Sequence, residues 1–318
     1  MGSSNCTHIA MSTFLLSGFP GLEGSHHWIA IPIFSVYLVA MLGNVMILYV
    51  IKTDPSLHQP MFYFLSMLAL TDLGLCISTM PTVLGVLWFQ VKKINVFACI
   101  FQLYLIHSFS FMESAVLFAM ALDRFLAICF PLRYASILTN SRVAKIGLVL
   151  SLRSTMILLP PAPFVLSFHY RTNIALSHSY CLHQNVIRLA CADTKFNSVY
   201  ALTVILFTLG SDFLFILLSY GMILKTVLSI ASETERRKAL STCVSHVCAV
   251  LVFYIPVFGL SIAHRFGKHT LPLLHVVMGN VYILFPPLMN PIIYSIKTKQ
   301  IYNRIFRIIW RKVGKRRR

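Results

Sequence analysis

Charged residues are scarce in this chain. Of its 318 residues only 11% are Asp, Glu, Lys or Arg and only nine are acidic, whereas 57% are hydrophobic. A soluble domain of this length needs a far more charged surface. The composition therefore excludes an ordinary soluble protein, and several uninterrupted apolar runs of bilayer length indicate an integral membrane protein.

The start of the chain lacks basic residues. No Lys or Arg precedes Lys52, and the polar first residues contain neither a basic region nor a short apolar region before a cleavage site. We therefore expect no cleavable signal peptide, and we expect the first apolar run to act as the insertion signal. The sequon at Asn5 predicts glycosylation if this end is lumenal.

Internal repeats and nucleic-acid-binding motifs are also missing. The lack of repeats argues against most secondary transporters. The net charge of +18 does not indicate nucleic acid, because the basic residues lie between the apolar runs and in the C-terminal tail. His178, Cys181 and His183 lie close together, but no further metal ligand has a convincing spacing. We expect neither an enzyme nor a required cofactor.

Seven apolar runs are long enough to cross a bilayer. They cover residues 28–51, 60–88, 98–130, 143–167, 196–229, 237–264 and 272–295. The prediction is an all-α bundle of seven transmembrane helices over 28–295, after an N-terminal segment 1–27 and before a tail 296–318. Most basic residues fall on the tail's side, which predicts an extracellular N-terminus and a cytoplasmic C-terminus.

The third run and the tail carry polar features that need explanation. The third run begins near Cys99, holds Glu113 at its middle and ends in Asp123-Arg124, a pair that lipid does not tolerate unpaired. In the tail, isoleucines fall on one face of a helix among arginines, which predicts an amphipathic eighth helix on the inner leaflet. The final basic residues are expected to be drawn to anionic lipid.

The motifs in these runs identify a family resemblance. They are Gly43-Asn44, LHQPMFYFL at 57–65, MALDRFLAIC at 120–129, Ser219-Tyr220, KALSTCVSH at 238–246 and PLMNPIIY at 287–294. Together they resemble the olfactory receptors, which are rhodopsin-like G-protein-coupled receptors. The segments 178–184 and 264–267 resemble the class I branch near family 51. Leu122 and Phe125 depart from the family's usual tyrosines, which puts the basal activity in doubt.

The resemblance implies a disulfide and an inner polar cavity. Cys99 and Cys181 are the implied disulfide, and Cys191 is a further cysteine that could pair on the outer side. Asp72, Glu113 and Asn290 are implied to surround one cavity, where a sodium ion bound to Asp72 and Glu113 is the hypothesis. Protonation of Glu113 is the competing interpretation.

The resemblance also implies an activation switch. Arg124 is expected to pair with Asp123 at rest and to turn toward Tyr220 when the sixth helix moves. The other implied members of this relay are His246, Asn290, Pro291 and Tyr294, and Arg124 and Lys238 are expected to contact the G protein. A hydrogen-bonded core histidine is the competing interpretation of His246.

The predicted ligand site lies between helices three, five and six. Arg265 is the basic residue at the outer mouth, and a guanidinium binds a carboxylate through two parallel hydrogen bonds. The predicted binding residues are Tyr104, His107, Phe111, Leu158, Gln184, Ala201, Ile205, Tyr254, Ser261 and Arg265. We therefore expect a carboxylic-acid odorant, although Arg265 could instead close the mouth by binding loop carbonyls or lipid phosphate.

Competing functions make different demands on the sequence. An opsin needs a lysine within the last span, which this chain lacks, and an aminergic receptor needs an acid in the outer half of the third. The alternatives are the same receptor fold with neutral odorants as ligands, or a transporter or channel. The resemblance implies a plasma-membrane receptor that activates a stimulatory heterotrimeric G protein and raises cyclic AMP.

Overall fold

A bundle of long helices forms the body of the computed structural model, which describes residues 13–170, 175–266 and 272–315. The long helices are α1 (His26–Thr53), α2 (Pro60–Leu87), α3 (Val96–Cys129), α5 (Asn140–Met156), α9 (Gly210–Leu228), α10 (Glu233–Phe266), α11 (Pro272–Lys297) and α12 (Lys299–Lys315). Shorter helices are α4 (Pro131–Ile137), α6 (Ala162–Ser167), α7 (His183–Arg188) and α8 (Lys195–Val204). The predicted glycosylation site at Asn5 lies outside the described residues.

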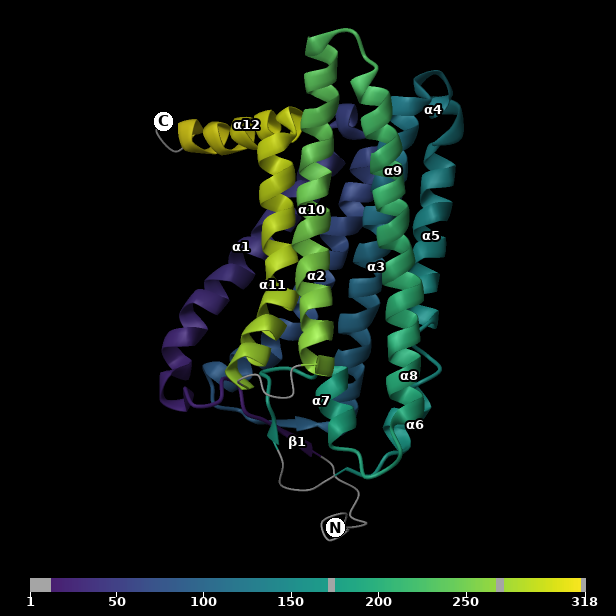
Figure 1. Ribbon diagram of the computed structural model, residues 1–318. Helices are drawn as coiled ribbons and strands as arrows, with labels where there is room; N and C mark the ends of the chain where they lie inside the picture. The colour runs from purple at the N-terminus through teal and green to yellow at the C-terminus, as the bar shows by residue number, and fades with distance from the viewer. Residues whose placement is uncertain (1–12, 171–174, 267–271, 316–318) are drawn as a thin grey trace.

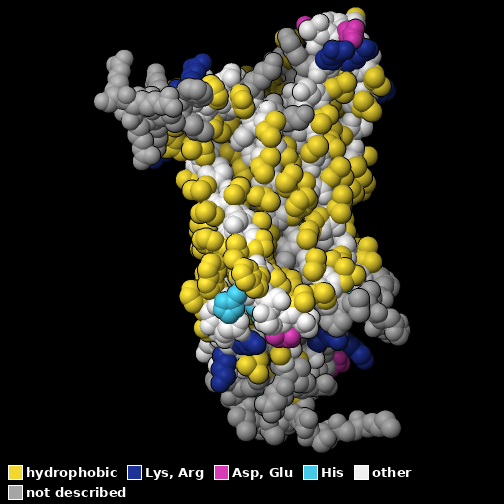
Figure 2. All heavy atoms as spheres, turned by 90° about the vertical axis from the view of Figure 1, so that its left-hand side faces the viewer, with side chains coloured by type: hydrophobic (Ala, Val, Ile, Leu, Met, Phe, Trp, Pro, Cys, Tyr) yellow, Lys and Arg dark blue, Asp and Glu magenta, His cyan; other side chains and the backbone are white. Residues whose placement is uncertain are grey.

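Six helical stretches in these described ranges are long and apolar enough to cross a bilayer. They correspond to six of the seven predicted runs. Figure 2 shows apolar side chains over the middle of one face of the bundle, with Lys and Arg gathered toward its two ends. This distribution matches a membrane-spanning bundle, because the bilayer interior excludes charges.

The fourth predicted span, 143–167, differs from the prediction of one continuous helix. It consists of α5, a series of turns and α6, with Pro160 and Pro161 between the two helices. Proline lacks the N–H that an α-helix requires, so the carbonyl of Ile157 loses its normal donor at Pro161. The hydroxyl of Tyr200 donates to that carbonyl at 2.7 Å instead. The carbonyl left without a donor at the break is thus hydrogen-bonded by a side chain of α8.

Proline also shapes the contact between α1 and α11. Asn44 donates through Nδ2 to the carbonyl of Pro287 at 3.0 Å, a carbonyl that the nearby Pro291 cannot reach with an N–H. A Cβ added at Gly43 would lie 2.9 Å from the ring of Pro291. The Gly43-Asn44 pair therefore allows the two helices to approach closely and supplies the missing donor.

Three short strands, which the sequence did not predict, form a small sheet at one end of the bundle (Figure 1). They are β1 (Thr13–Leu16), β2 (Lys93–Asn95) and β3 (Ala175–Leu176). The central strand β1 pairs antiparallel with β2, with Thr13 opposite Asn95, and parallel with β3, with Leu15 opposite Ala175. The helix α12 crosses the opposite end at a steep angle to the bundle axis.

Buried isoleucines attach α12 to the bundle. Ile301 is fully buried, and Ile305 and Ile308 are partly buried against the same core. Arg304 on this helix forms an ion pair with Asp54 at 3.4 Å, next to the end of α1. One face of the predicted amphipathic helix therefore packs on protein.

Candidate ligand-binding cavity

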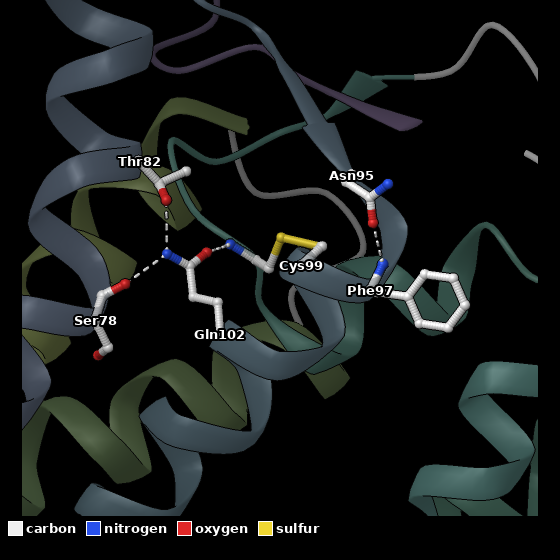
Figure 3. Close-up of a disulfide and its surroundings, with 7 residues drawn as sticks. Ser78, Thr82, Asn95, Phe97, Cys99 and Gln102 are labelled. Carbon is white, nitrogen blue, oxygen red and sulfur yellow. Dashed lines mark hydrogen bonds between the residues drawn. A yellow bond between two sulfur atoms is a disulfide. The ribbon is translucent and has the colours of Figure 1, made fainter. Parts of the chain in front are cut away.

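A disulfide ties the loop before α7 to the start of α3. Cys99 and Cys181 are bonded, with Cα atoms 5.5 Å apart, which confirms the predicted pair. Gln102, one turn along α3, accepts a hydrogen bond from the amide of Cys181 at 3.0 Å. Its Nε2 donates to the carbonyl of Ser78 at 2.7 Å and to the hydroxyl of Thr82 at 2.8 Å (Figure 3). One buried side chain thus connects the loop to both α2 and α3.

Cys191 is also disulfide-bonded. The sequence marked it only as a cysteine that could pair. The chain segment around α7 is therefore held covalently at Cys181 and at Cys191.

The loop lies over a cavity of about 130 Å³ between α3, α6, α8 and α10. By this measure one water takes roughly 10–15 Å³, so the space suits a molecule of about ten non-hydrogen atoms. Its lining is mostly apolar, with a few polar groups, as small-molecule sites usually are. The π-helical segment Ile205–Leu209, a kind of irregularity common at functional sites, contributes two lining residues.

Eight of the ten predicted binding residues line this cavity. They are Tyr104, His107, Phe111, Leu158, Gln184, Ala201, Ile205 and Ser261. Tyr254 does not line it, because its hydroxyl lies deeper, against Ser114. Arg265 lies in the last turn of α10, but its side chain is outside the described part of the structure.

Other lining residues were missed by the sequence analysis, and Asn197 is the most notable. It is 1% exposed, and neither of its amide atoms has a hydrogen-bond partner in the described ranges. Gln184 lines the same cavity, and its Oε1 is likewise buried without a partner. No clear signal marked it in the sequence, because Asn197 lies beside the polar residues Lys195 and Ser198 at the start of an apolar run. Unpaired buried amides give the cavity hydrogen-bonding capacity for a ligand.

Two histidines also line the cavity. The rings of His107 on α3 and His183 on α7 meet edge to face, with centroids 6.1 Å apart. Burial lowers the pKa of His183 to about 4. His183 is therefore neutral near pH 7, where it can donate one hydrogen bond and accept another.

Beneath the cavity, four helices meet in a polar network that the sequence analysis did not find. Asp212 on α9 is buried and accepts hydrogen bonds from Nη1 of Arg153 at 3.0 Å and from Nη2 at 2.5 Å. Ser114 on α3 donates to the same carboxylate at 2.9 Å, and the hydroxyl of Tyr254 on α10 lies 2.8 Å from Ser114. The network links α5 and α9 to α10 directly below the ligand cavity.

Asp72, Glu113 and Asn290 are brought together at the centre of the bundle. The Nδ2 of Asn290 lies 3.1 Å from Oδ2 of Asp72 and 3.1 Å from Oε1 of Glu113. All three residues are at most 2% exposed. Within the described residues no cluster of three or more His, Cys, Asp or Glu side chains could hold a metal ion. The oxygen ligands that a monovalent cation would have here are thus the two carboxylates, because Asn290 presents its Nδ2 to them.

The end of the bundle near α12 differs from the predicted resting switch. Among the described side chains Asp123 makes no ion pair with Arg124, and it accepts the hydroxyl of Tyr134 on α4 at 2.7 Å. The guanidinium of Arg124 instead contacts the sulfur of Met61. The guanidinium of Arg124 is therefore not held by the carboxylate of Asp123 in this structure.

Other predicted switch residues connect the helices at this end. The hydroxyl of Tyr220 on α9 lies 2.7 Å from Nδ1 of His246 on α10, with the rings stacked. Tyr294 is buried with its hydroxyl 4.0 Å from the sulfur of Met120. The side chain of Lys238 lies outside the described residues.

Comparisons with known proteins agree with this architecture. The family model described as "Olfactory receptor" matches residues 33–312. Human olfactory receptor 51G2 is 59% identical over 302 residues, which cover 95% of this chain and 96% of the relative. Human olfactory receptor 51V1 is 57% identical over 93% of this chain and 92% of its own length, and 51B5 is 55% identical over 97% of each.

The family determines what can be stated about class and location. Olfactory receptors are multi-pass plasma-membrane proteins that respond to odorants, couple to G proteins and catalyse no reaction. The extent of the match, together with the helical bundle and its disulfide-tied loop, leaves one assignment. The chain belongs to the olfactory receptors, within family 51, and has their rhodopsin-like seven-helix fold.

Proposed function

We propose that this receptor binds a small aliphatic carboxylic acid in the cavity and activates a stimulatory heterotrimeric G protein, which raises cyclic AMP. The observation that carries the proposal is the largely apolar cavity below the disulfide-tied loop. Its size suits about ten non-hydrogen atoms. The N-terminus faces the outside in this proposal, so the loop covers the site on the side from which odorants arrive.

Arg265 is the proposed anchor for the acid. It follows Ser261 by four residues on α10, and Ser261 lines the cavity, so both positions fall on one helical face. A guanidinium at the mouth would bind a carboxylate through two parallel charge-assisted hydrogen bonds. His107 supplies a second donor. The aliphatic chain would then pack among Phe111, Leu158, Ala201 and Ile205, which line the apolar part.

Ligand binding is proposed to act through the polar network below the cavity. Tyr254 and Ser114 connect α10 to α3, and Asp212 connects both to α9. A ligand that favours another arrangement of α10 would shift the population toward an open cytoplasmic face. There the bond between Tyr220 and His246 would break, and Arg124 would turn to Tyr220 and the G protein.

Other proposed parts of this relay lie in α11 and at the cytoplasmic surface. Pro291 and Tyr294 allow α11 to adjust, because proline removes a backbone hydrogen bond. Lys238 would contact the G protein. A sodium ion held by Asp72 and Glu113, beside Asn290, would stabilise the resting state. The tail helix α12 would lie along the inner leaflet with its basic residues near anionic lipid.

The test is a cyclic AMP assay in cells with straight-chain carboxylic acids and the alcohols and aldehydes of equal chain length. Each series is applied to the unmodified receptor and to Arg265→Ala, with surface expression measured for both. Acids that activate only the unmodified receptor support the proposal. Equal activation by neutral compounds, unaffected by Arg265→Ala, would leave the receptor assignment intact and refute the acid anchor.

A further inference from the structure

Asn197 is an unpaired polar group inside the cavity. Its side chain is 1% exposed, and both Nδ2 and Oδ1 lack a partner among the described residues. Buried polar groups are nearly always hydrogen-bonded in folded proteins, because burying them unpaired costs free energy. An asparagine in this state on a cavity wall is therefore a candidate for contact with the ligand.

The two unpaired atoms of Asn197 can both be paired only by a ligand group that donates one hydrogen bond and accepts another. Asn197 offers one amide donor group and one carbonyl acceptor, and Gln184 adds a second buried carbonyl oxygen on the same cavity. Exchanging the positions of Nδ2 and Oδ1 in the amide of Asn197 does not change this requirement, since neither atom has a partner. His107 and His183 do not alter it either, because a neutral imidazole can serve as donor or acceptor.

Ligand groups differ in how they meet that demand. A carboxylate, an aldehyde or an ether only accepts hydrogen bonds, so each would leave the oxygen of Asn197 unpaired. A hydroxyl donates one hydrogen bond and accepts others, so it can pair with both the oxygen and the nitrogen of Asn197. A methyl group at the same place would pair with neither.

We propose that the ligand carries a hydroxyl group that binds Asn197, in addition to the acid group proposed for Arg265. The preferred ligands are then aliphatic hydroxy acids, with the two polar groups held at separate points of the cavity. The acid part of this inference rests on the proposed function, whereas the hydroxyl part rests on it only in taking the cavity as the odorant site. It adds a specificity-determining residue on α8 that discriminates between hydroxylated and unsubstituted chains.

The experiment compares three sets of straight-chain acids of equal length: unsubstituted, hydroxylated at each carbon in turn, and methoxylated at the same carbons. Potency is measured by cyclic AMP in cells, and binding by the ligand-induced shift in melting temperature of the purified receptor. For the unmodified receptor we expect at least one hydroxy acid to exceed its unsubstituted and methoxy counterparts by about tenfold or more.

Two variants identify the residue responsible. Asn197→Leu keeps the approximate volume without the hydrogen bonds, and we expect it to abolish the preference for the hydroxy acid. Asn280→Leu is the matched control, because Asn280 is a buried asparagine that does not line the cavity. We expect the control to retain the preference. If Asn197→Leu fails to fold, the three ligand sets on the unmodified receptor still decide whether the ligand's hydroxyl group is recognised.

The outcomes separate this inference from the proposed function. If unsubstituted acids are active and no hydroxy acid exceeds them, the hydroxyl inference is overturned and the acid proposal stands. If no acid binds or activates, the acid proposal fails. Alcohols and their methyl ethers, compared by melting temperature, then test the hydroxyl inference alone, and equal shifts from both would overturn it.

Discussion

Arg153 on α5 and Asp212 on α9 form an ion pair joined by two hydrogen bonds, although 59 residues separate them in the chain. Asp212 is 2% exposed and also accepts from Ser114. We expect Asp212→Ala to lower the free energy of unfolding by about 3 kcal/mol, because it leaves a partly buried cation without its counter-charge.

A double-mutant cycle on the purified receptor measures this coupling. The cycle uses Arg153→Met, Asp212→Leu and the two combined. The double variant removes both charges and should recover most of the melting temperature lost by either of these single variants. Additive losses in the double variant would show that the two side chains do not stabilise one another.

The contact between Gly43 and Pro291 gives a second prediction. A Cβ at residue 43 would lie 2.9 Å from a rigid proline ring, so Gly43→Ala should separate α1 from α11 and cost about 1–3 kcal/mol. Gly85→Ala is the matched control within α2, where an added Cβ meets nothing within 4 Å. It should stabilise by about 0.5–1 kcal/mol. Equal melting temperatures for the two variants would rule out the close approach.

The buried His183 predicts an acid sensitivity of the loop that covers the cavity. Its folded-state pKa of about 4 lies below the ordinary value of 6.5, so the unfolded chain binds a proton first as the pH falls. Stability is therefore lost from about pH 6.5 downward and levels off near pH 4. At pH 5 the loss from this group is about 2 kcal/mol. Thermal unfolding at pH 7 and pH 5 should show a smaller difference for His183→Gln than for the unmodified receptor.

Gln102 supports the disulfide through three hydrogen bonds to α2 and to the loop. Gln102→Leu should leave the disulfide intact but lower stability by about 1–3 kcal/mol, because the amide of Cys181 loses its acceptor. The exposed Gln59, whose side chain bonds only to a local carbonyl, provides the control Gln59→Leu. Melting temperatures that fall equally in both variants would contradict this role.

The apolar runs predicted the helices well because a bilayer imposes length and composition on every span. The same argument failed at Pro160-Pro161, where the apolar run continues but the backbone cannot continue as an α-helix. The hydroxyls of Tyr104 and Tyr200 donate hydrogen bonds to carbonyls at the end of α5. No local sequence pattern predicts such contacts between helices.

Long-range polar pairing was the part of the site that local spacing could not predict. Periodicity relates residues on one helix, and eight of the predicted cavity residues follow from it and from the family resemblance. The partner of Asp212 depends on how α5 packs against α9. Arg153, an arginine inside an apolar run, was a signal that such a partner existed. Likewise, the contact of Asp123 with Tyr134 required the placement of α4.

The small sheet constrains the order in which the receptor can be completed during synthesis. Its central strand, β1, leaves the ribosome first, yet its partners β2 and β3 lie roughly 80 and 160 residues later. One edge of β1 must therefore wait for β2, which follows the second span, and the other edge stays unpaired until β3 has been made after the fourth. Closing the sheet and the Cys99–Cys181 bond are then late, mutually supporting steps, and a chaperone that shields an unpaired strand would be most useful before them.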